Sequence, residues 1–161
     1  MAIGDRSYSR FSMAIPAGAL RAIGRLNVPV YRATGGRVGG RVGKAPVLLL
    51  TTTGRKSGEP RTAPVLYLSD GGRLVVIGSN AGNPRTPAWA LNLAANPDAE
   101  IEIGRKRQTV RARIAQGSER SELWRKVNDL YAGFADYEER TSRDISVFVL
   151  EPGSASPVAR R

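Results

Sequence analysis

The stretch LLLTTTGRKSGEPRTAPVLYLSDGGRLVVIGSNAG, residues 48–82, decides the fold, because it contains strands and turns in direct succession. Pro46–Thr53 is apolar and ends in threonines, which is typical of a buried strand. Arg61–Leu68 is predicted to be the second strand and Arg73–Gly78 the third. The sequence Asp70-Gly71-Gly72 between them fits a tight hairpin turn. The stretch therefore predicts an antiparallel meander.

Further strands and two helices are predicted in the rest of the chain. Ala99–Ile103 and Thr109–Ala115 alternate apolar and charged residues, as half-buried strands do, and Ile145–Leu150 is a final apolar strand. Pro87–Ala95 suits a short helix, and Ser118–Tyr131 carries an apolar stripe at helical spacing. Six strands in mostly hairpin order, with inserted helices, predict a mainly β (α+β) fold built as a small antiparallel barrel.

The residues before the barrel differ in character from the barrel itself. Apolar residues recur at helical spacing over residues 7–33, and residues 34–44 are glycine-rich and basic. We therefore expect an N-terminal helical arm with a glycine-rich link over residues 1–44, a barrel domain over residues 45–152 and a disordered tail over residues 153–161. Because the arm combines apolar residues with arginines, its apolar face either lies on an anionic membrane surface or packs on the barrel.

Composition excludes several classes of protein. The 161-residue chain contains no cysteine and no histidine, which rules out disulfides, thiol nucleophiles, Ser-His-Asp triads, zinc hydrolases and haem–histidine sites. Its net charge of +11 favours anionic partners. No stretch approaches the roughly 18 apolar residues that span a bilayer, and the N-terminus lacks the features of a cleaved signal. We expect a cytoplasmic protein, peripheral at the inner face of the plasma membrane if the arm binds lipid.

The first candidate site is the turn within Thr51–Arg61. Arg55, Lys56 and Arg61 place cations beside glycines and hydroxyl groups at the end of a strand. Such a group of donors suits a phosphate or carboxylate ligand. The alternative is an ordinary basic hairpin turn, and the residues alone do not separate the two.

The second candidate is Ile77–Pro97, where glycines permit the close approach of a flat ligand. Ser79 and Asn80 can donate hydrogen bonds there, and the start of the following helix can face an anion. Trp89 lies on this helix and is either a wall of the pocket or plain core.

The third candidate is Leu130–Arg143. Tyr131, Phe134 and Tyr137 fall three residues apart, so on a continuous helix they would share a face. These aromatic residues either line an apolar pocket or cap the barrel.

Together these segments resemble the deazaflavin-dependent nitroreductase family of actinobacteria. The matching pieces are residues 48–82, TPAWALNLAANP (86–97), DLYAGFADYEERT (129–141) and VFVLEP (147–152). Their order and spacing fit over some two thirds of the chain. The resemblance implies a six-stranded split β-barrel of the FMN-binding type that holds the ring of coenzyme F420 in a groove. It also implies hydride transfer from the reduced deazaflavin to a small planar organic acceptor, such as a quinone, an enone or a nitro compound.

The resemblance further assigns residues of this sequence to the site. The positions that match the binding site for the cofactor's phosphate and oligoglutamate tail are Arg55, Lys56, Ser57 and Arg61. The strand along the ring is matched by Thr62, Ala63, Pro64, Val65 and Leu66. The other walls are matched by Ile77, Gly78, Ser79, Asn80, Ala88, Trp89, Ala90, Leu91 and Asn92. The positions around the acceptor are matched by Leu66, Ser79, Tyr131, Phe134 and Tyr137, of which Ser79, Tyr131 and Tyr137 are the candidate catalytic proton donors.

The sequence departs from the family pattern at several of these positions. Asn80 stands where the family often has lysine, and Ala90 where it has tyrosine. Leu66 and Phe134 replace tyrosines on the acceptor side. We expect cofactor binding to be retained, because the basic turn is intact. We also expect a quinone to be preferred over a nitroaromatic drug, since a buried polar group without a partner costs about 1–3 kcal/mol.

Three alternatives stay open. An FMN-using relative would need fewer cations than the basic turn supplies. A carrier would bind the deazaflavin or a lipid without turnover. A nucleic-acid binder is suggested by the charge of +11, but the sequence has no known recognition helix, so we expect no nucleic-acid partner. The oligomeric state is not predicted.

Overall fold

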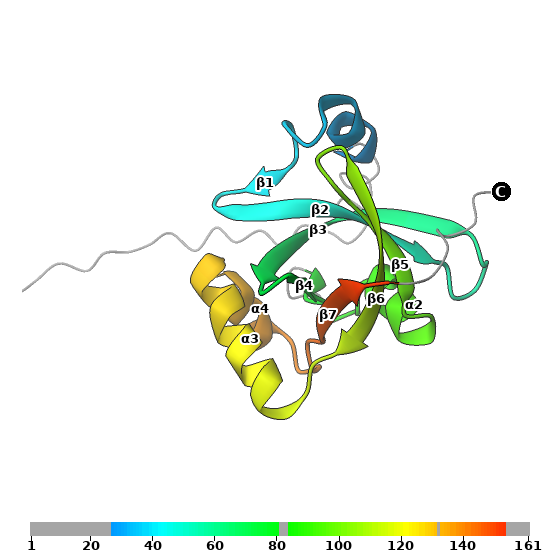
Figure 1. Cartoon of the computed structure of the whole chain (residues 1–161). Helices are drawn as coiled ribbons and strands as arrows, with labels where there is room; N and C mark the ends of the chain where they lie inside the picture. The colour runs from blue at the N-terminus through cyan, green and yellow to red at the C-terminus, as the bar shows by residue number, and fades with distance from the viewer. Residues whose placement is uncertain (1–26, 81–83, 132, 154–161) are drawn as a thin grey trace, which may run out of the picture.

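The described residues form a closed antiparallel barrel, which confirms the predicted fold class. The computed structural model describes residues 27–80, 84–131 and 133–153. Within them the strand order is β1-β2-β3-β4-β7-β6-β5, and pairing of β2 with β5 closes the barrel (Figure 1). The strands are β1 (Arg41–Val42), β2 (Ala45–Thr53), β3 (Pro60–Asp70), β4 (Arg73–Ile77), β5 (Asp98–Ile103), β6 (Lys106–Ile114) and β7 (Val147–Pro152).

The predicted strands are present, with shifts at their ends. The final strand begins at Val147 instead of Ile145 and continues to Pro152. The strand predicted from Thr109 begins at Lys106. The short strand β1, which lies in the stretch expected to be a link, was not predicted. Gly71 and Gly72 both have positive φ, 58° and 83°, which is the backbone of a tight hairpin turn and explains why glycines stand there.

Besides the helical residues 27–34, the described part of the chain has helices outside the barrel wall at α2 (Ala88–Ala95), α3 (Gly117–Leu130) and α4 (Gly133–Arg140). The sequence placed the first two correctly to within a residue or two. The predicted helix Ser118–Tyr131 corresponds to α3, which ends at Leu130, and a separate helix begins at Gly133, so Tyr131 and Phe134 do not lie on one continuous helix. Figure 1 shows α3 and α4 together on one side of the barrel and α2 near β5.

Alternation along β3 divides the core into two main clusters. Ala63 and Val65 face the first cluster, which fills the barrel interior with Leu48, Leu50 and Phe148. Leu66 and Leu68 point the opposite way and pack against the second cluster, beneath α3 and α4. Successive side chains of a strand point to opposite faces, so one strand contributes to both. The predicted ring-lining residues therefore lie on two different faces of the wall.

Residues 27–34 are helical and attach to the barrel through Tyr31. The Tyr31 hydroxyl donates to the Val47 carbonyl at 3.1 Å and accepts from the Gly104 amide at 3.1 Å. Arg32 adds an ion pair with Glu102 at 2.8 Å. In the glycine-rich stretch that follows, the Gly36 amide donates to the Tyr31 carbonyl at 2.8 Å. This part of the N-terminal segment thus packs on the barrel. Residues 1–26 and the tail from residue 154 lie outside the described chain.

None of the helices in the described ranges has the length and apolar character needed to cross a bilayer.

Candidate functional site

The basic turn is the connection between β2 and β3. The Gly58 amide donates to the Gly54 carbonyl and the Gly54 amide to the Glu59 carbonyl, both at 2.8 Å. Gly58 has φ of 72°, a conformation that favours glycine. A Cβ at Gly54 would lie 2.7 Å from the Ser57 hydroxyl and 3.1 Å from the Glu59 carbonyl oxygen, so a side chain at this position would displace Ser57. The glycines therefore set the shape of the turn.

The cations of this turn are exposed and, among the described residues, have no carboxylate partner. Arg55, Lys56 and Arg61 all have exposed side chains. Over residues 27–80, 84–131 and 133–153, no Asp or Glu lies within ion-pair distance of any of them. The arginines of the barrel wall differ, since Arg107 and Arg113 are paired with glutamates. The charge of the turn is thus available to an anionic ligand.

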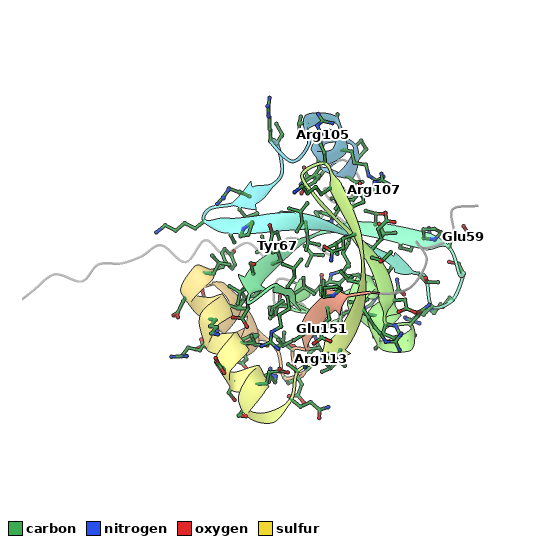
Figure 2. All side chains as sticks on the ribbon, in the orientation of Figure 1. Glu59, Tyr67, Arg105, Arg107, Arg113 and Glu151 are labelled. Atoms are coloured by element: carbon green, nitrogen blue, oxygen red, sulfur yellow. The ribbon has the colours of Figure 1, made fainter. Side chains whose placement is uncertain are left out.

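Ser57 lies inside the turn and orders it. Its hydroxyl accepts from the Glu59 amide at 3.2 Å, and Nη2 of Arg61 lies 3.5 Å from the same oxygen. Figure 2 labels Glu59 at this turn, on the side of the barrel away from α3 and α4. Ser57 therefore links the turn to the first side chains of β3.

Asn92, on helix α2, supports the basic turn through side-chain hydrogen bonds. Asn92 is only 5% exposed. Its Oδ1 accepts from the backbone amide of Arg55 at 3.1 Å, and its Nδ2 donates to Thr52 Oγ1 at 3.0 Å. Both ends of the amide are thus engaged within the protein. The sequence had placed Asn92 among the ring-contacting residues, and the structure places it against the backbone of the basic turn.

Its neighbours on α2 have different surroundings. Trp89 packs against the barrel core, with its ring 5.8 Å from that of Phe148, which corresponds to the core alternative stated for this residue. Ala90 is buried and touches the end of β4, since a Cβ on Gly78 would lie 3.4 Å from Cβ of Ala90. Ala88 is exposed and Leu91 half-buried. Through Ala90 and Asn92, helix α2 contacts both the end of β4 and the basic turn.

The residues of β3 divide between the two faces of the wall. Thr62 Oγ1 lies 2.8 Å from Thr51 Oγ1 across the β2–β3 pair, on the same face of the sheet as Pro64 and Leu66. Ala63 and Val65 face the barrel core. Of the predicted ring-lining strand, Thr62, Pro64 and Leu66 share the outer face.

The end of β4 is held by a residue that the sequence did not single out. The Arg143 guanidinium donates to the Gly78 carbonyl at 3.0 Å and to the Ser79 carbonyl at 2.8 Å. Burial lowers the pKa of Arg143, which nonetheless stays charged. Ser79 is 6% exposed. Asn80 has φ of 47° and donates to the Arg85 carbonyl at 2.8 Å, so its side chain holds the local backbone. Arg143 ended the third candidate segment, but its partners lie too far away in sequence for spacing to identify them.

Of the aromatic residues predicted to lie around the acceptor, Tyr131 and Phe134 lie in the second core cluster, together with Ile77. Phe134 is 5% exposed, and its ring centroid lies 5.2 Å from that of Tyr131 in an edge-on arrangement and 6.4 Å from that of Trp124. Tyr131 is half-buried. The side chain of Tyr137 lies outside what the structure describes, although its backbone belongs to α4.

Comparison with known proteins agrees with this geometry. The F420H(2)-dependent quinone reductase family model matches residues 23–152. The F420H(2)-dependent quinone reductase Rv1261c of Mycobacterium tuberculosis is 45% identical over 130 residues, which cover 78% of this chain and 87% of the relative.

Two solved structures are also similar. The F420-H2 dependent reductase FDR-A has a TM-score of 0.61 and 36% identity, over 66% of this chain and 94% of that one. A domain-swapped dimer has a TM-score of 0.63 and 31% identity, over 85% of this chain and all of that one. The match of residues 23–152 spans most of the chain and includes the basic turn, α2 and residues 130–143. This chain therefore belongs to the F420H(2)-dependent quinone reductase family.

Proposed function

We propose that this protein binds reduced coenzyme F420 at the basic turn and catalyses hydride transfer to a quinone. The observation that carries the proposal is the group of exposed cations Arg55, Lys56 and Arg61, which has no carboxylate partner in the described chain and is supported by Asn92. Family membership supplies the class of cofactor.

The donors of the turn fit the acidic part of this cofactor. Coenzyme F420 carries a phosphate and an oligoglutamate tail, so it presents several negative charges. Three cations on one turn exceed what the single phosphate of FMN requires, which favours F420 over FMN. The hydroxyls of Thr51 and Thr62 share the hairpin with these cations and add polar contacts beside them.

Reduced F420 supplies the hydride, and the protein supplies position, exclusion of water and a proton. A chain without histidine and cysteine can do this, because no protein nucleophile or metal is needed. Ser79, Tyr131 and Tyr137 are the hydroxyl groups proposed as proton donors to the reduced acceptor. Leu66, on the outer face of β3, is proposed to contact the acceptor ring.

A quinone suits this site better than a nitroaromatic compound. Leu66 offers apolar surface where the family pattern has a tyrosine, and Phe134, which also replaces a tyrosine, is buried in the same cluster against Trp124 and Tyr131. A quinone can bury its ring there and needs one donor for a carbonyl. A nitro group would lack partners for its oxygens, which is unfavourable when it is desolvated.

The test begins with cofactor choice. The purified protein should retain F420 in fluorescence titrations and bind FMN much more weakly. Stopped-flow oxidation of reduced F420 should then be faster with menadione than with a bicyclic nitroimidazole. Tighter binding of FMN would overturn the cofactor assignment. If the protein binds F420 but does not catalyse oxidation of reduced F420 by any acceptor, it is instead a carrier.

We also propose that the face formed by residues 30–44 lies on an anionic membrane. Val30, Val38 and Val42 are 42%, 53% and 48% exposed, and exposed Arg37, Arg41 and Lys44 lie among them. Apolar side chains surrounded by cations are typical of surfaces that lie at a lipid interface. Figure 2 shows Arg105 and Arg107 at the same end of the barrel. A membrane-bound enzyme would meet lipid-soluble quinones directly.

A further inference from the structure

Arg143 belongs to the connection between α4 and β7, yet it acts on the end of β4. After Ile77 the chain leaves the strand, and the polar groups of Gly78 and Ser79 need new partners. The Gly78 amide donates to the Ser146 carbonyl at 2.9 Å. The Gly78 and Ser79 carbonyls accept from Nη1 and Nη2 of Arg143 at 3.0 and 2.8 Å. One connection therefore provides partners for three polar groups of this short segment.

The planar guanidinium makes this arrangement specific. The two terminal nitrogens of the guanidinium have a fixed geometry and donate to two successive carbonyl groups, so they fix the orientation of both peptide planes. A lysine ammonium carries the same charge but lacks this fixed geometry. A hydrogen bond from a charged donor to each carbonyl also polarises the peptide unit, which makes the amides of Ser79 and Asn80 stronger donors.

The connection that carries Arg143 is itself anchored. Ile145 and Val147 lie in the second core cluster with Ile77 and Phe134. On the other side, Gly78 lies against Ala90 of α2. The Ser79 segment is therefore held between α2 and the α4–β7 connection, whose Ile145 packs in the same cluster as Phe134.

We infer that Arg143 is a positioning residue that orients Ser79 and the Gly78–Asn80 backbone toward the reacting ring and acceptor. The inference rests on the proposed function, which places Ser79 beside the acceptor. Arg143 itself acts through the two carbonyl groups. Misplacement of this segment should reduce turnover more than cofactor binding, because the basic turn that holds the cofactor's tail is supported separately, by Asn92.

The test compares Arg143→Lys and Arg143→Gln with Arg125→Lys, an exposed arginine on α3. We expect both Arg143 variants to melt cooperatively and to bind F420 with unchanged affinity. Their kcat with menadione should fall by about tenfold or more, since small misplacements of reacting groups are costly. Arg125→Lys should match the unmodified protein throughout.

A double-mutant cycle with Ser79→Ala makes the test specific. If Arg143 acts through Ser79, adding Arg143→Lys to Ser79→Ala should cost much less kcat than Arg143→Lys alone. Full kcat in Arg143→Lys, additive losses in the cycle, or failure of both Arg143 variants to fold would overturn the inference. If the unmodified protein binds no F420, or does not catalyse oxidation of reduced F420 by any quinone, the proposed function itself fails, which is a different result.

Discussion

The side-chain carbonyl of Asn92 accepts a hydrogen bond from the backbone amide of Arg55 at 3.1 Å, so a residue of α2 holds the backbone at the first cation of the basic turn in place. The other end of the Asn92 amide donates to Thr52 at 3.0 Å. The turn is thus supported by a buried amide whose hydrogen bonds are made within the protein, while its cations point outward. If the cofactor's tail binds at this turn as proposed, its binding and the stability of the turn are therefore linked.

Asn92→Ala should weaken F420 binding and destabilise the fold together. Removing a buried partner leaves the Arg55 amide unsatisfied, at a cost of about 1–3 kcal/mol in the free energy of unfolding. Loss of order in the turn should weaken F420 binding by about tenfold. Denaturant unfolding and fluorescence titration measure the two effects. Gln108→Ala removes an exposed amide on β6 and should change neither. Unchanged F420 affinity in Asn92→Ala would show that Asn92 serves only the fold.

Lys56→Ala and Arg61→Ala should each weaken F420 binding while leaving the melting temperature unchanged. Charge-assisted hydrogen bonds contribute about 1.5–3 kcal/mol each, so a loss of affinity of about tenfold or more is expected. Added salt should weaken binding by the unmodified protein and have less effect on the variants. Lys106→Ala removes an exposed cation from the β5–β6 hairpin and is the matched control. Equal F420 dissociation constants for all four proteins would show that the cofactor's tail does not bind at this turn.

Leu66→Tyr should shift acceptor preference from menadione toward a bicyclic nitroimidazole. The new hydroxyl supplies a donor on the outer face of β3, and such a donor is worth about 1 kcal/mol, or several-fold in the ratio of kcat/KM values. Phe134→Tyr is a useful comparison, because its hydroxyl would enter a buried cluster and should lower stability more than it changes preference. An unchanged ratio in Leu66→Tyr would exclude this residue from the acceptor site.

Membrane binding should depend on the exposed valines of residues 30–44. The double variant Val38→Asp/Val42→Asp should pellet less with anionic liposomes than the unmodified protein, because it loses apolar contact and gains negative charge. Ile114→Asp changes a residue of similar exposure, 44%, on β6 and should pellet normally. A chain lacking residues 1–26 keeps Tyr31 and its contacts with the barrel, so it separates the contribution of the preceding residues from that of this face. Equal pelleting of all forms would end the proposal.

Acid should destabilise the contact between α3 and the β3–β4 hairpin. Hydrogen bonds from Lys126 and then Arg73 hold the pKa of Asp70 below its usual value of 3.8. Because the pKa of Asp70 is lower in the folded protein than in the unfolded chain, Asp70 stabilises the fold at pH values above the unfolded pKa of 3.8. This stabilisation is lost as the pH falls below 3.8 through the folded pKa. Asp70→Asn should lose about 1 kcal/mol or less near neutral pH, since the pairs are near the surface. Its stability should also fall less steeply in acid. Urea unfolding across this range measures both, with Asp129→Asn on α3 as control, and identical acid slopes would contradict the assignment.

Much of the fold was determined by the sequence alone. Alternation in β5 and β6, the apolar run of β2 and the Asp70-Gly71-Gly72 turn encode their structures within a few residues, so the barrel strands could be located directly. The end of α3 was predicted to within a residue, whereas the separate helix α4 was not predicted, since the spacing of the aromatic residues fits a continuation of α3 equally well. The cluster of cations in the basic turn and the family resemblance likewise needed only the order of residues.

The tertiary structure decided which side chains meet. Asn92 and Arg55 are 37 positions apart, and Arg143 and Ser79 are 64 apart. No local pattern records such pairs, because they depend on where α2 and the α4–β7 connection settle on the barrel. The same holds for Trp89 and Phe134, whose aromatic character is visible in the sequence but whose burial follows from packing against Phe148 and Trp124. Local periodicity sets which face of an element is apolar, whereas closure of the barrel sets which residues those faces contact.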